Sequence, residues 1–314
     1  MTPWLTKVVE KDGTQKQLEA WTDAAEKYGF PDWDLHDQKG LQRVLATNIY
    51  RTKDGRYYHC HGSMNSDETL KALGLPLQCD KSDSYDTVAE RIQKVVEQID
   101  SEELDVLMNE KHKQAGTIAW TSEEFFASEH GKANAHVGLY EITKPAGQDQ
   151  PASWWPENAS MPSSGSRPLA GLKVVDLTRV IAAPSLTRGL AEMGASVMRI
   201  TASHLTDLSG VHQDLNWGKW NAHLNLKTAT GQEALRKLIM EADVVVEGYR
   251  PGAMERNGFG REAIFDMLKD RKRGVIHVRE NCYGWNGPWQ HRSGWQQISD
   301  AVGFPGCHHH ANIR

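Results

Sequence analysis

Long hydrophobic runs are missing from this chain of 314 residues. No apolar stretch approaches the roughly 18–20 residues of a membrane-spanning helix. The first residues, Met1 to Asp12, also lack the apolar core of a secretory signal. A strong excess of one charge is missing too, since 36 Lys and Arg stand against 41 Asp and Glu, a net charge of −5. Nucleic acid and anionic membranes need a basic face, so neither is an expected partner. We expect a soluble intracellular protein in the cytoplasm, with an organelle left open.

Cysteine is scarce, and no pair has C-x-x-C spacing. The four cysteines are Cys60, Cys79, Cys282 and Cys307. In a chain of this length they are expected to be reduced thiols. His59-Cys60-His61 and the run from Cys307 to His310 place histidine beside cysteine, but no second cluster at zinc spacing accompanies them. We therefore expect no metal site. Strand alternation predicts that His59 and His61 share one face and that Cys60 points to the other.

What the sequence does contain is ordinary globular composition, with 39% apolar and 25% charged residues. At about 150 residues per domain, this length suggests two domains. A stretch rich in Pro, Ser and Gly at 146–168 predicts a linker, and Trp154 and Trp155 within it are expected to pack against a domain. The predicted organisation is an N-terminal arm (1–40), a small α/β domain (41–145), the linker (146–168), a Rossmann-like domain (169–305) and an irregular tail (306–314).

The N-terminal half has the pattern of a small α/β unit. Asp54-Gly55 lies between two runs of β-forming residues and predicts a hairpin. Thr121 to Glu124 has the sequence of a capping box, which opens a helix. Apolar spacing and breaker residues predict helices at about 15–28, 66–73, 84–98, 101–114 and 122–129.

In the C-terminal half, strand patterns alternate with helix patterns. Helices are predicted over 184–193, from a capping box at Thr230–Glu233 to about 241, and over 252–270. Such alternation indicates βαβ units and a parallel, Rossmann-like sheet with flanking helices. Ligands of these sheets bind beyond the carboxyl ends of the strands, so the candidate loops are 178–184, 201–206, 247–252 and 279–288. The predicted strands are 173–177, 196–200, 222–226, 243–247 and 275–278.

The first of these loops lacks G-x-G-x-x-G, which argues against a nicotinamide oxidoreductase. It still places Arg179 just before a helix N-terminus, a position that suits an anionic group. Arg250 and Arg256 follow the fourth predicted strand, where they could reach phosphates as bidentate donors. The alternative is that these arginines are solvated surface charges.

Several segments of this half carry a family resemblance, in the same order as in the family. They are Pro168 to Pro184, Gly194 to Ile200, Leu226-Lys227-Thr228 with Gly231, Ala242 to Glu247, Arg250-Pro251-Gly252 with Gly258, and the motifs between Tyr283 and Trp295. Over about 167–301 the chain resembles the class III CoA-transferases, the CaiB/BaiF family.

The resemblance implies that coenzyme A binds as a co-substrate, with no metal. It further implies transfer of coenzyme A from an acyl-CoA, such as acetyl-CoA or succinyl-CoA, to a carboxylic acid. Family members form interlocked dimers, which implies a homodimer or a completing partner chain. Carried over by position, the implied coenzyme A contacts are Arg179, Val180, Ile181, Ala182, Gly248, Tyr249 and Arg256.

A second resemblance covers the N-terminal half. The segments 50–57, 73–76, 115–128 and 137–139 resemble the small domain of the same family. In the family that domain follows the large-domain sheet, whereas here it comes first. The chain therefore resembles the tail of one family copy followed by the head of another, as in a truncated tandem protein, or a permuted enzyme.

The catalytic residue stays unknown at this point. The family's nucleophilic Asp lies beyond the segment that ends near Trp295 and before the small domain, and no residue of this chain aligns with it. Asp176 lies within the first strand and is expected to be a hydrogen-bonded structural residue. The sequence leaves open a catalytically incomplete CoA- or partner-binding homologue, or an acyl-CoA racemase of the same family.

Overall fold

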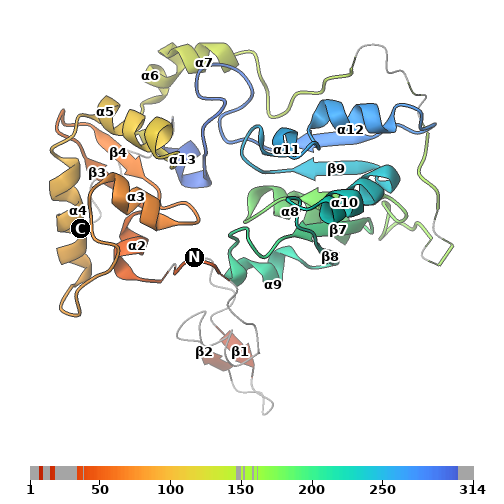
Figure 1. Cartoon of the computed structure of the whole chain (residues 1–314), viewed down its shortest axis with the longest axis horizontal. Coiled ribbons are helices and arrows are strands. Elements are labelled where there is room, and N and C mark those ends of the chain that lie inside the picture. The colour runs from red at the N-terminus through yellow and green to blue at the C-terminus, as the bar shows by residue number, and fades with distance from the viewer. Residues whose placement is uncertain are drawn as a thin grey trace.

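The computed structural model describes residues 7–9, 15–17, 34–37, 39–145, 150, 153–157, 159–160 and 162–302. Two bodies are visible in Figure 1. We call residues 41–134 the small unit, residues 169–279 the sheet unit, and residues 281–302 the docking segment. Within the described residues, no helix is long and apolar enough to cross a membrane.

The small unit is built on a three-stranded antiparallel sheet of order β3-β4-β5. Its strands are β3 (Asn48–Arg51), β4 (Tyr57–Cys60) and β5 (Gly116–Ile118). The predicted hairpin is confirmed, because β3 pairs with β4 and Gly55 adopts φ 80° in the turn between them. The helical elements are α2 (Leu41–Leu45), α3 (Ser66–Ala72), α4 (Tyr85–Val96), α5 (Ser101–Val106), the π-helical turn η2 (Leu107–Lys111), α6 (Ser122–Ala127) and α7 (Glu129–Asn134).

Strand β4 separates the core of the small unit from its outer side. Tyr58 and Cys60 are fully buried in the core cluster that also contains Ile92 of α4. His59 and His61 point the other way, and their ring centroids lie 6.0 Å apart. The predicted alternation of these residues is therefore confirmed.

Three helix predictions in this half need correction. The helix expected at 101–114 changes to a π-helical turn and ends at Lys111, so that the chain can enter β5, a strand that the pattern did not predict. The helix expected at 122–129 is interrupted at Ser128, whose hydroxyl caps α7 by accepting from Gly131 N at 3.0 Å. Residues 15–17 form strand β2 (Gln15–Gln17), paired with β1 (Lys7–Val9), and not a helix. Residues 18–28 lie outside the described residues.

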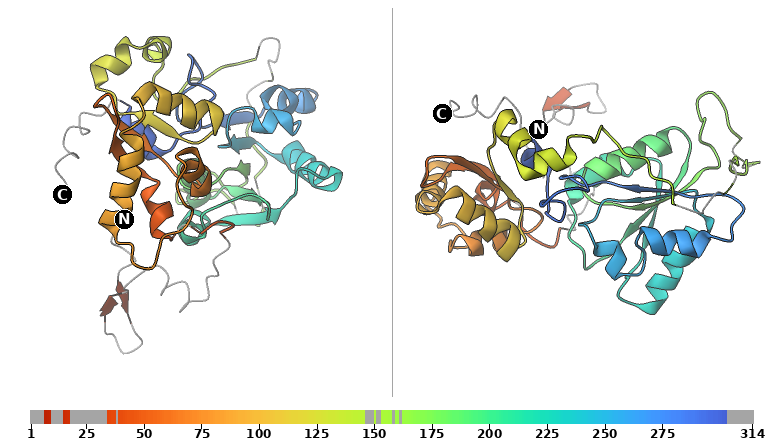
Figure 2. Two further views of the ribbon diagram at one scale, coloured as in Figure 1. Left: turned by 60° about the vertical axis from the view of Figure 1, so that its left-hand side comes forward. Right: turned by 90° about the horizontal axis from the view of Figure 1, so that it is seen from above.

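The sheet unit contains five parallel strands in the order β10-β9-β6-β7-β8. Helix α8 covers one face of the sheet, and α10 and α12 cover the other (Figure 2). The predicted fold class, a parallel Rossmann-like sheet with flanking helices plus a smaller α/β unit, is confirmed. The strands are β6 (Lys173–Leu177), β7 (Ser196–Thr201), β8 (Lys219–His223), β9 (Val244–Glu247) and β10 (Ile276–Arg279); the helices are α8 (Ala182–Glu192), η3 (Ser209–Val211), α9 (His212–Leu215), α10 (Ala229–Glu241), α11 (Ala253–Arg256) and α12 (Arg261–Leu268).

Alternation along the strands explains the two covered faces. Val174 belongs to the cluster that includes Ala183 of α8. Its neighbour Val175 belongs to the opposite cluster, with Leu235 of α10 and Ile264 of α12. Because successive strand residues point to opposite faces, a strand that is apolar at every position is buried on both sides.

The entry to α10 differs from the prediction. Strand β8 ends at His223, earlier than expected, and Thr228 rather than Thr230 caps the helix by accepting from Gly231 N at 3.1 Å. The capping box expected at Thr230–Glu233 is therefore wrong. A Cβ on Gly231 would lie 2.1 Å from the carbonyl oxygen of Asn225, so this turn requires glycine.

The helix expected over 252–270 is two helices. Helix α11 ends before Gly258, which adopts φ 79°, and α12 begins three residues later. A glycine in the left-handed region is a common way to end a helix.

The two tryptophans of the predicted linker differ in their surroundings. Trp155 donates from Nε1 to the carbonyl oxygen of Ala170 at 2.9 Å and packs against the sheet unit, as expected. Trp154 stacks on Trp155 at 4.2 Å but remains 75% exposed. The expectation that both rings pack against a domain is right for Trp155 and wrong for Trp154.

The docking segment joins the two units. Beyond β10 the chain leaves the sheet, and helix α13 (Gln296–Ala301) packs against β4 and β5. Trp295 stacks on His61 with ring centroids 5.2 Å apart, and Arg292 pairs with Asp105 at 2.8 Å. His130 of α7 stacks on Trp289 at 4.7 Å. The carboxyl edge of the sheet consequently faces the small unit (Figure 1).

Candidate functional site

The order of the strands places a switch point between β6 and β9. The chain runs from β6 outward to β7 and β8, and then returns to the other side of β6 to form β9 and β10. The loops after β6 and β9 therefore diverge from adjacent carboxyl ends, which is where open α/β sheets bind ligands. Gly248 is the first residue after β9, and a Cβ there would lie 3.0 Å from Cβ of Ala183. The absence of a side chain at Gly248 allows the two loops to approach each other.

Backbone strain marks the first of these loops. Val180 adopts φ 71°, which is rare for a β-branched residue and costs roughly 1–3 kcal/mol. Ile181 precedes helix α8 and is 54% exposed, and no side chain caps the helix. The first turn of α8 thus offers backbone N–H groups that lack a partner within the helix. N–H groups in this arrangement favour an anion.

Two arginines lie close together on the two loops. Arg179 donates from Nη1 to the carbonyl oxygen of Thr206 at 2.6 Å, and its guanidinium lies 5.1 Å from the ring centroid of Tyr249. Burial raises the pKa of Tyr249. Burial also lowers the pKa of Arg250, and the charge of Arg179 acts in the same direction. Positive charge is therefore concentrated between the loops after β6 and β9, where the guanidinium groups are partly desolvated.

A third arginine extends this cluster. Nη1 of Arg256 would lie 2.9 Å from a Cβ placed on Gly252, so this side chain folds back over the end of the loop after β9. In the described part of the chain, we find no carboxylate paired with Arg179, Arg250 or Arg256. Several other arginines are paired with carboxylates, as Arg199 is with Asp207. Unpaired guanidinium groups bind carboxylates and phosphates strongly because their N–H donors are charged and directional.

The structure brings six of the seven predicted contact residues together. Residues 179–182 form the loop and helix start after β6, and Gly248 and Tyr249 form the start of the loop after β9. Arg256 lies one short helix further along, at the end of α11. Of the other candidate loops, 201–206 contributes Thr206, the partner of Arg179. That these residues bind coenzyme A stays a prediction.

A buried ion pair supports the loop after β6 from below. Lys219 of β8 donates to Oδ2 of Asp176 at 3.0 Å, and both side chains are 0% exposed. Thr178 and Thr187 donate to the same carboxylate at 2.5 and 2.7 Å. Burial lowers the pKa of Lys219, and the charge of Asp176 opposes that shift. The prediction that Asp176 is a hydrogen-bonded structural residue is confirmed.

Sequence reasoning missed two residues of this neighbourhood. Lys219 lies in a strand whose start was placed too late, so its partnership with Asp176 was not visible. Glu280 directly follows β10, and its carboxylate lies beside Gly248, with Oε2 3.5 Å from the position of a Cβ there. Its place immediately after a strand was the available signal, since Gly248 holds the same position after β9.

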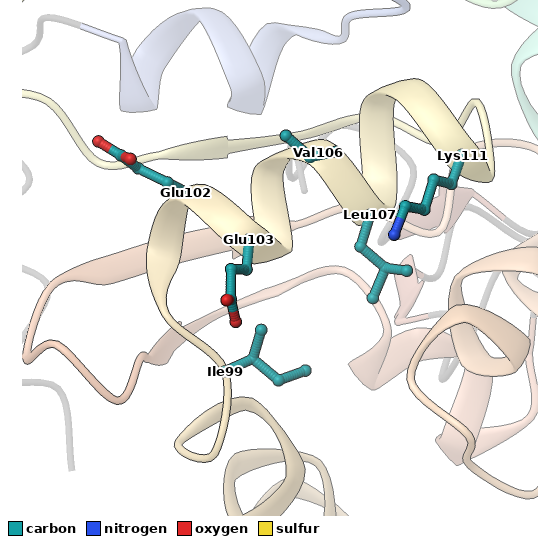
Figure 3. Close-up of a pocket in the computed structure, with 6 residues that line it drawn as sticks. All are labelled: Ile99, Glu102, Glu103, Val106, Leu107 and Lys111. Carbon is teal, nitrogen blue, oxygen red and sulfur yellow. The ribbon is translucent and has the colours of Figure 1, made fainter.

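A depression of about 500 Å³ lies on the small unit, away from this edge. It is formed along α5 and η2 (Figure 3). Its lining contains no nucleophile beside a base and no cluster of cations. No group of three or more His, Cys, Asp or Glu suited to a metal occurs among the described residues. The lining residues are Ile99, Glu102, Glu103, Val106, Leu107 and Lys111.

Comparison with known proteins shows which family the sheet unit is similar to. The sequence profile of CoA-transferase family III matches residues 169–310. This segment is similar to CoA-transferase family III. The resemblance predicted from the motifs is confirmed, and the match covers the whole sheet unit, including the loops after β6 and β9.

Relatives extend the likeness to the small unit. The chain is 55% identical over 302 residues to the acetyl-coenzyme A transferase nodX of Hypoxylon pulicicidum, an alignment that covers 96% of this chain and 51% of that protein. It is 36% identical over 277 residues to an acyl-CoA transferase of Gibberella moniliformis, covering 87% of this chain and 48% of that protein. The chain thus spans about half the length of these relatives. The order in which the small unit precedes the sheet unit is therefore shared with nodX.

Shorter matches reach proteins of bacteria. A formyl-CoA:oxalate CoA-transferase of Escherichia coli is 35% identical over 150 residues, which cover 44% of this chain and 35% of that protein. A solved structure of a CAIB/BAIF family protein from Brucella suis is 26% identical, with a TM-score of 0.39 over 44% of this chain and 39% of that chain.

Proposed function

We propose that the chain binds coenzyme A at the switch point between β6 and β9 and takes part in CoA transfer from an acyl-CoA to a carboxylic acid. Acetyl-CoA and succinyl-CoA are the donors we would test first. The observation that carries this proposal is a group of three guanidinium groups, those of Arg179, Arg250 and Arg256. They lie on the loops after β6 and β9 and at the end of α11, and we find no carboxylate partner for them among the described residues. The match of residues 169–310 to the family model of CoA-transferase family III supports it, as does the name of the nodX relative.

The residues present suit the chemistry of the ligand. Coenzyme A carries its negative charge on phosphate groups, which bidentate guanidinium donors and the open first turn of a helix both favour. We assign the phosphates to Arg179, Arg250 and Arg256 and to the N–H groups at the start of α8. Val180, Ile181 and Ala182 would line the ligand from the loop after β6, and Gly248 and Tyr249 from the loop after β9.

We further propose a cytoplasmic protein that acts as a homodimer or together with a completing chain, organised as the five segments predicted from the sequence. A second candidate function is a CoA-binding homologue that is inactive alone. The observation in its favour is that the aspartates nearest the site are already engaged: Asp176 with Lys219, and Asp207 with Arg199.

The test is isothermal titration with coenzyme A beside a thioester-exchange assay. Arg179→Ala and Arg250→Ala should each weaken binding by about 10-fold or more, since a hydrogen bond to a charged group contributes about 1.5–3 kcal/mol. Arg236→Ala is the matched control, because that arginine is 50% exposed on α10 beside Glu233. Unchanged affinity in both loop variants would refute the site. Binding without exchange would favour the second candidate.

A further inference from the structure

The N-terminal arm makes a second connection between the two units, apart from the docking segment. Oδ1 of Asp34 accepts hydrogen bonds from the backbone N–H and from the hydroxyl of Ser209, each at 2.7 Å. Ser209 is 7% exposed and is the first residue of η3 in the sheet unit. Helix α2 of the small unit begins only a few residues after Asp34, so the end of the arm bridges the two bodies (Figure 1).

The arm is also fastened to the small unit. Oδ2 of Asp37 pairs with Nη1 of Arg43 at 3.2 Å, and Nε of Arg43 pairs with Asp67 at 2.8 Å. Oδ1 of Asp37 accepts from the backbone N–H of Gly40 at 3.2 Å, immediately before α2. These contacts tie the arm to the small unit, whereas Asp34 ties it to the sheet unit.

Ser209 lies at the end of the loop that supports Arg179. This loop connects β7 to η3. Within it, Thr206 accepts from Nη1 of Arg179, with its carbonyl oxygen at 2.6 Å and with its hydroxyl at 3.2 Å. The next residue, Asp207, is paired with Arg199 of β7. The sheet therefore holds this loop through Asp207, and the arm holds it through Ser209.

Thr206 fixes the direction of the guanidinium group of Arg179. The N–H donors of a planar guanidinium point in fixed directions, so holding one nitrogen determines where the others point. Among the residues that the structure describes, we find no acceptor for Nε or Nη2 of Arg179. These two nitrogens can therefore donate to a phosphate, in a direction that depends on the position of Thr206.

We propose that Asp34 is a positioning residue for the proposed coenzyme A site, and that the arm couples the small unit to the orientation of Arg179. This inference rests on the proposed function, which assigns a phosphate of coenzyme A to that guanidinium. Asp34 acts without touching the ligand. It holds Ser209, and the loop that ends there holds Thr206 against Arg179. Release of the arm lets the loop shift, and a small misplacement of the donors weakens their contact with the phosphate.

The experiment is isothermal titration of the full chain with coenzyme A. Asp34→Ala removes both hydrogen bonds to Ser209 and should weaken binding by about three- to tenfold, less than Arg179→Ala, because Asp207 still holds the loop. Asp34→Asn should bind within about twofold of the wild type, because both donors share one oxygen and an amide also provides an acceptor oxygen. Asp266→Ala is the matched control and should keep wild-type affinity, since Asp266 is an exposed residue of α12 paired with Lys269.

A double-mutant cycle separates positioning from a purely structural role. In the Arg179→Ala background, Asp34→Ala should weaken binding by no more than about twofold, because Asp34 acts through that guanidinium. Equal losses in the two backgrounds would overturn the proposal. Ser209→Ala removes only the hydroxyl donor, so it should show the same non-additivity with a smaller loss, and the test does not depend on one variant.

The two proposals fail in different ways. Wild-type affinity in Asp34→Ala, together with weakened binding in Arg179→Ala, would overturn the role of Asp34 and leave the binding site standing. A wild-type chain that does not bind coenzyme A would overturn both.

Discussion

Replacing Lys219 by Met should destabilise the sheet unit more than any surface charge change. The ammonium donates at 2.7–3.0 Å to Asp176, Thr187 and the carbonyl oxygen of Pro184, and its side chain is 0% exposed. Methionine has a similar length and no charge, so the variant leaves the Asp176 carboxylate buried with only two hydroxyl donors. Removing one partner of a buried ion pair costs about 3–5 kcal/mol, mostly because the remaining charge is uncompensated.

Urea unfolding is the assay for this prediction. With a slope of about 1–3 kcal/mol per molar urea, a loss of this size lowers the midpoint by more than about 1 M. Lys173→Met is the matched control, because Lys173 pairs with Glu241 at 2.6 Å while both side chains remain more than half exposed. That exposed pair should contribute only about 0–1 kcal/mol. Equal losses in the two variants would refute the argument that burial, and not the ion pair itself, determines the size of the effect.

Three further predictions concern other parts of the chain. Burial lowers the pKa of His59 and of His61 to about 4, so the stability that each neutral histidine contributes is complete above pH 6.5 and should be lost as the pH falls toward 4, by about 3 kcal/mol per histidine. Between pH 7 and pH 4.5, the urea midpoint of the double variant His59→Gln with His61→Gln should therefore change less than that of the wild type. A double variant whose midpoint falls as steeply as that of the wild type would contradict this prediction. Gly231→Ala should lower the thermal midpoint, because its Cβ would lie 2.1 Å from a backbone carbonyl oxygen. Gly189→Ala is the control: a Cβ there lies in open space within α8 and should stabilise the protein by up to about 1 kcal/mol. Changes of the thermal midpoint in the same direction for both variants would be inconsistent with these contacts. Val180→Gly should raise the free energy of unfolding by about 1 kcal/mol, because glycine adopts φ 71° without the backbone strain that valine has there. The same variant should weaken coenzyme A binding, because glycine makes the loop more flexible. An unchanged denaturation midpoint would show that no strain is stored at this residue.

The order of elements in the sheet unit was predictable from the sequence because its strands are short apolar runs between helix-length patterns. Their boundaries were less predictable where a polar turn decides them. Strand β8 contains Trp220 and His223, which are exposed at the edge of the sheet, so its pattern is not that of a buried strand. The helix after it begins where Thr228 can cap and Gly231 can approach Asn225, a condition set by backbone geometry and not by hydrophobic spacing.

The small unit illustrates a different limit of sequence reasoning. The helix around 101–114 has continuous helical spacing, but its last residues become a π-helical turn. The side-chain amide of Asn109 donates to the carbonyl oxygen of Gly116 at 2.9 Å, which ties the end of that turn to the start of β5. This contact depends on the pairing of β5 with β4, a long-range interaction that no local pattern contains.

The candidate site was foreseeable because the residues that form it follow strands directly. Arg179 lies two residues after β6 and Gly248 lies one residue after β9, and adjacent parallel strands bring such positions to one edge. The sequence could not show which of the charged side chains near this edge are paired with an opposite charge. Asp176 and Glu280 are both carboxylates near this edge, but Lys219 neutralises the first from a strand 43 residues away. Asp176 is a buried, neutralised carboxylate that supports the fold, whereas Glu280 is exposed and has no side-chain donor that we find in the described part of the chain. Only the three-dimensional contacts distinguish the two.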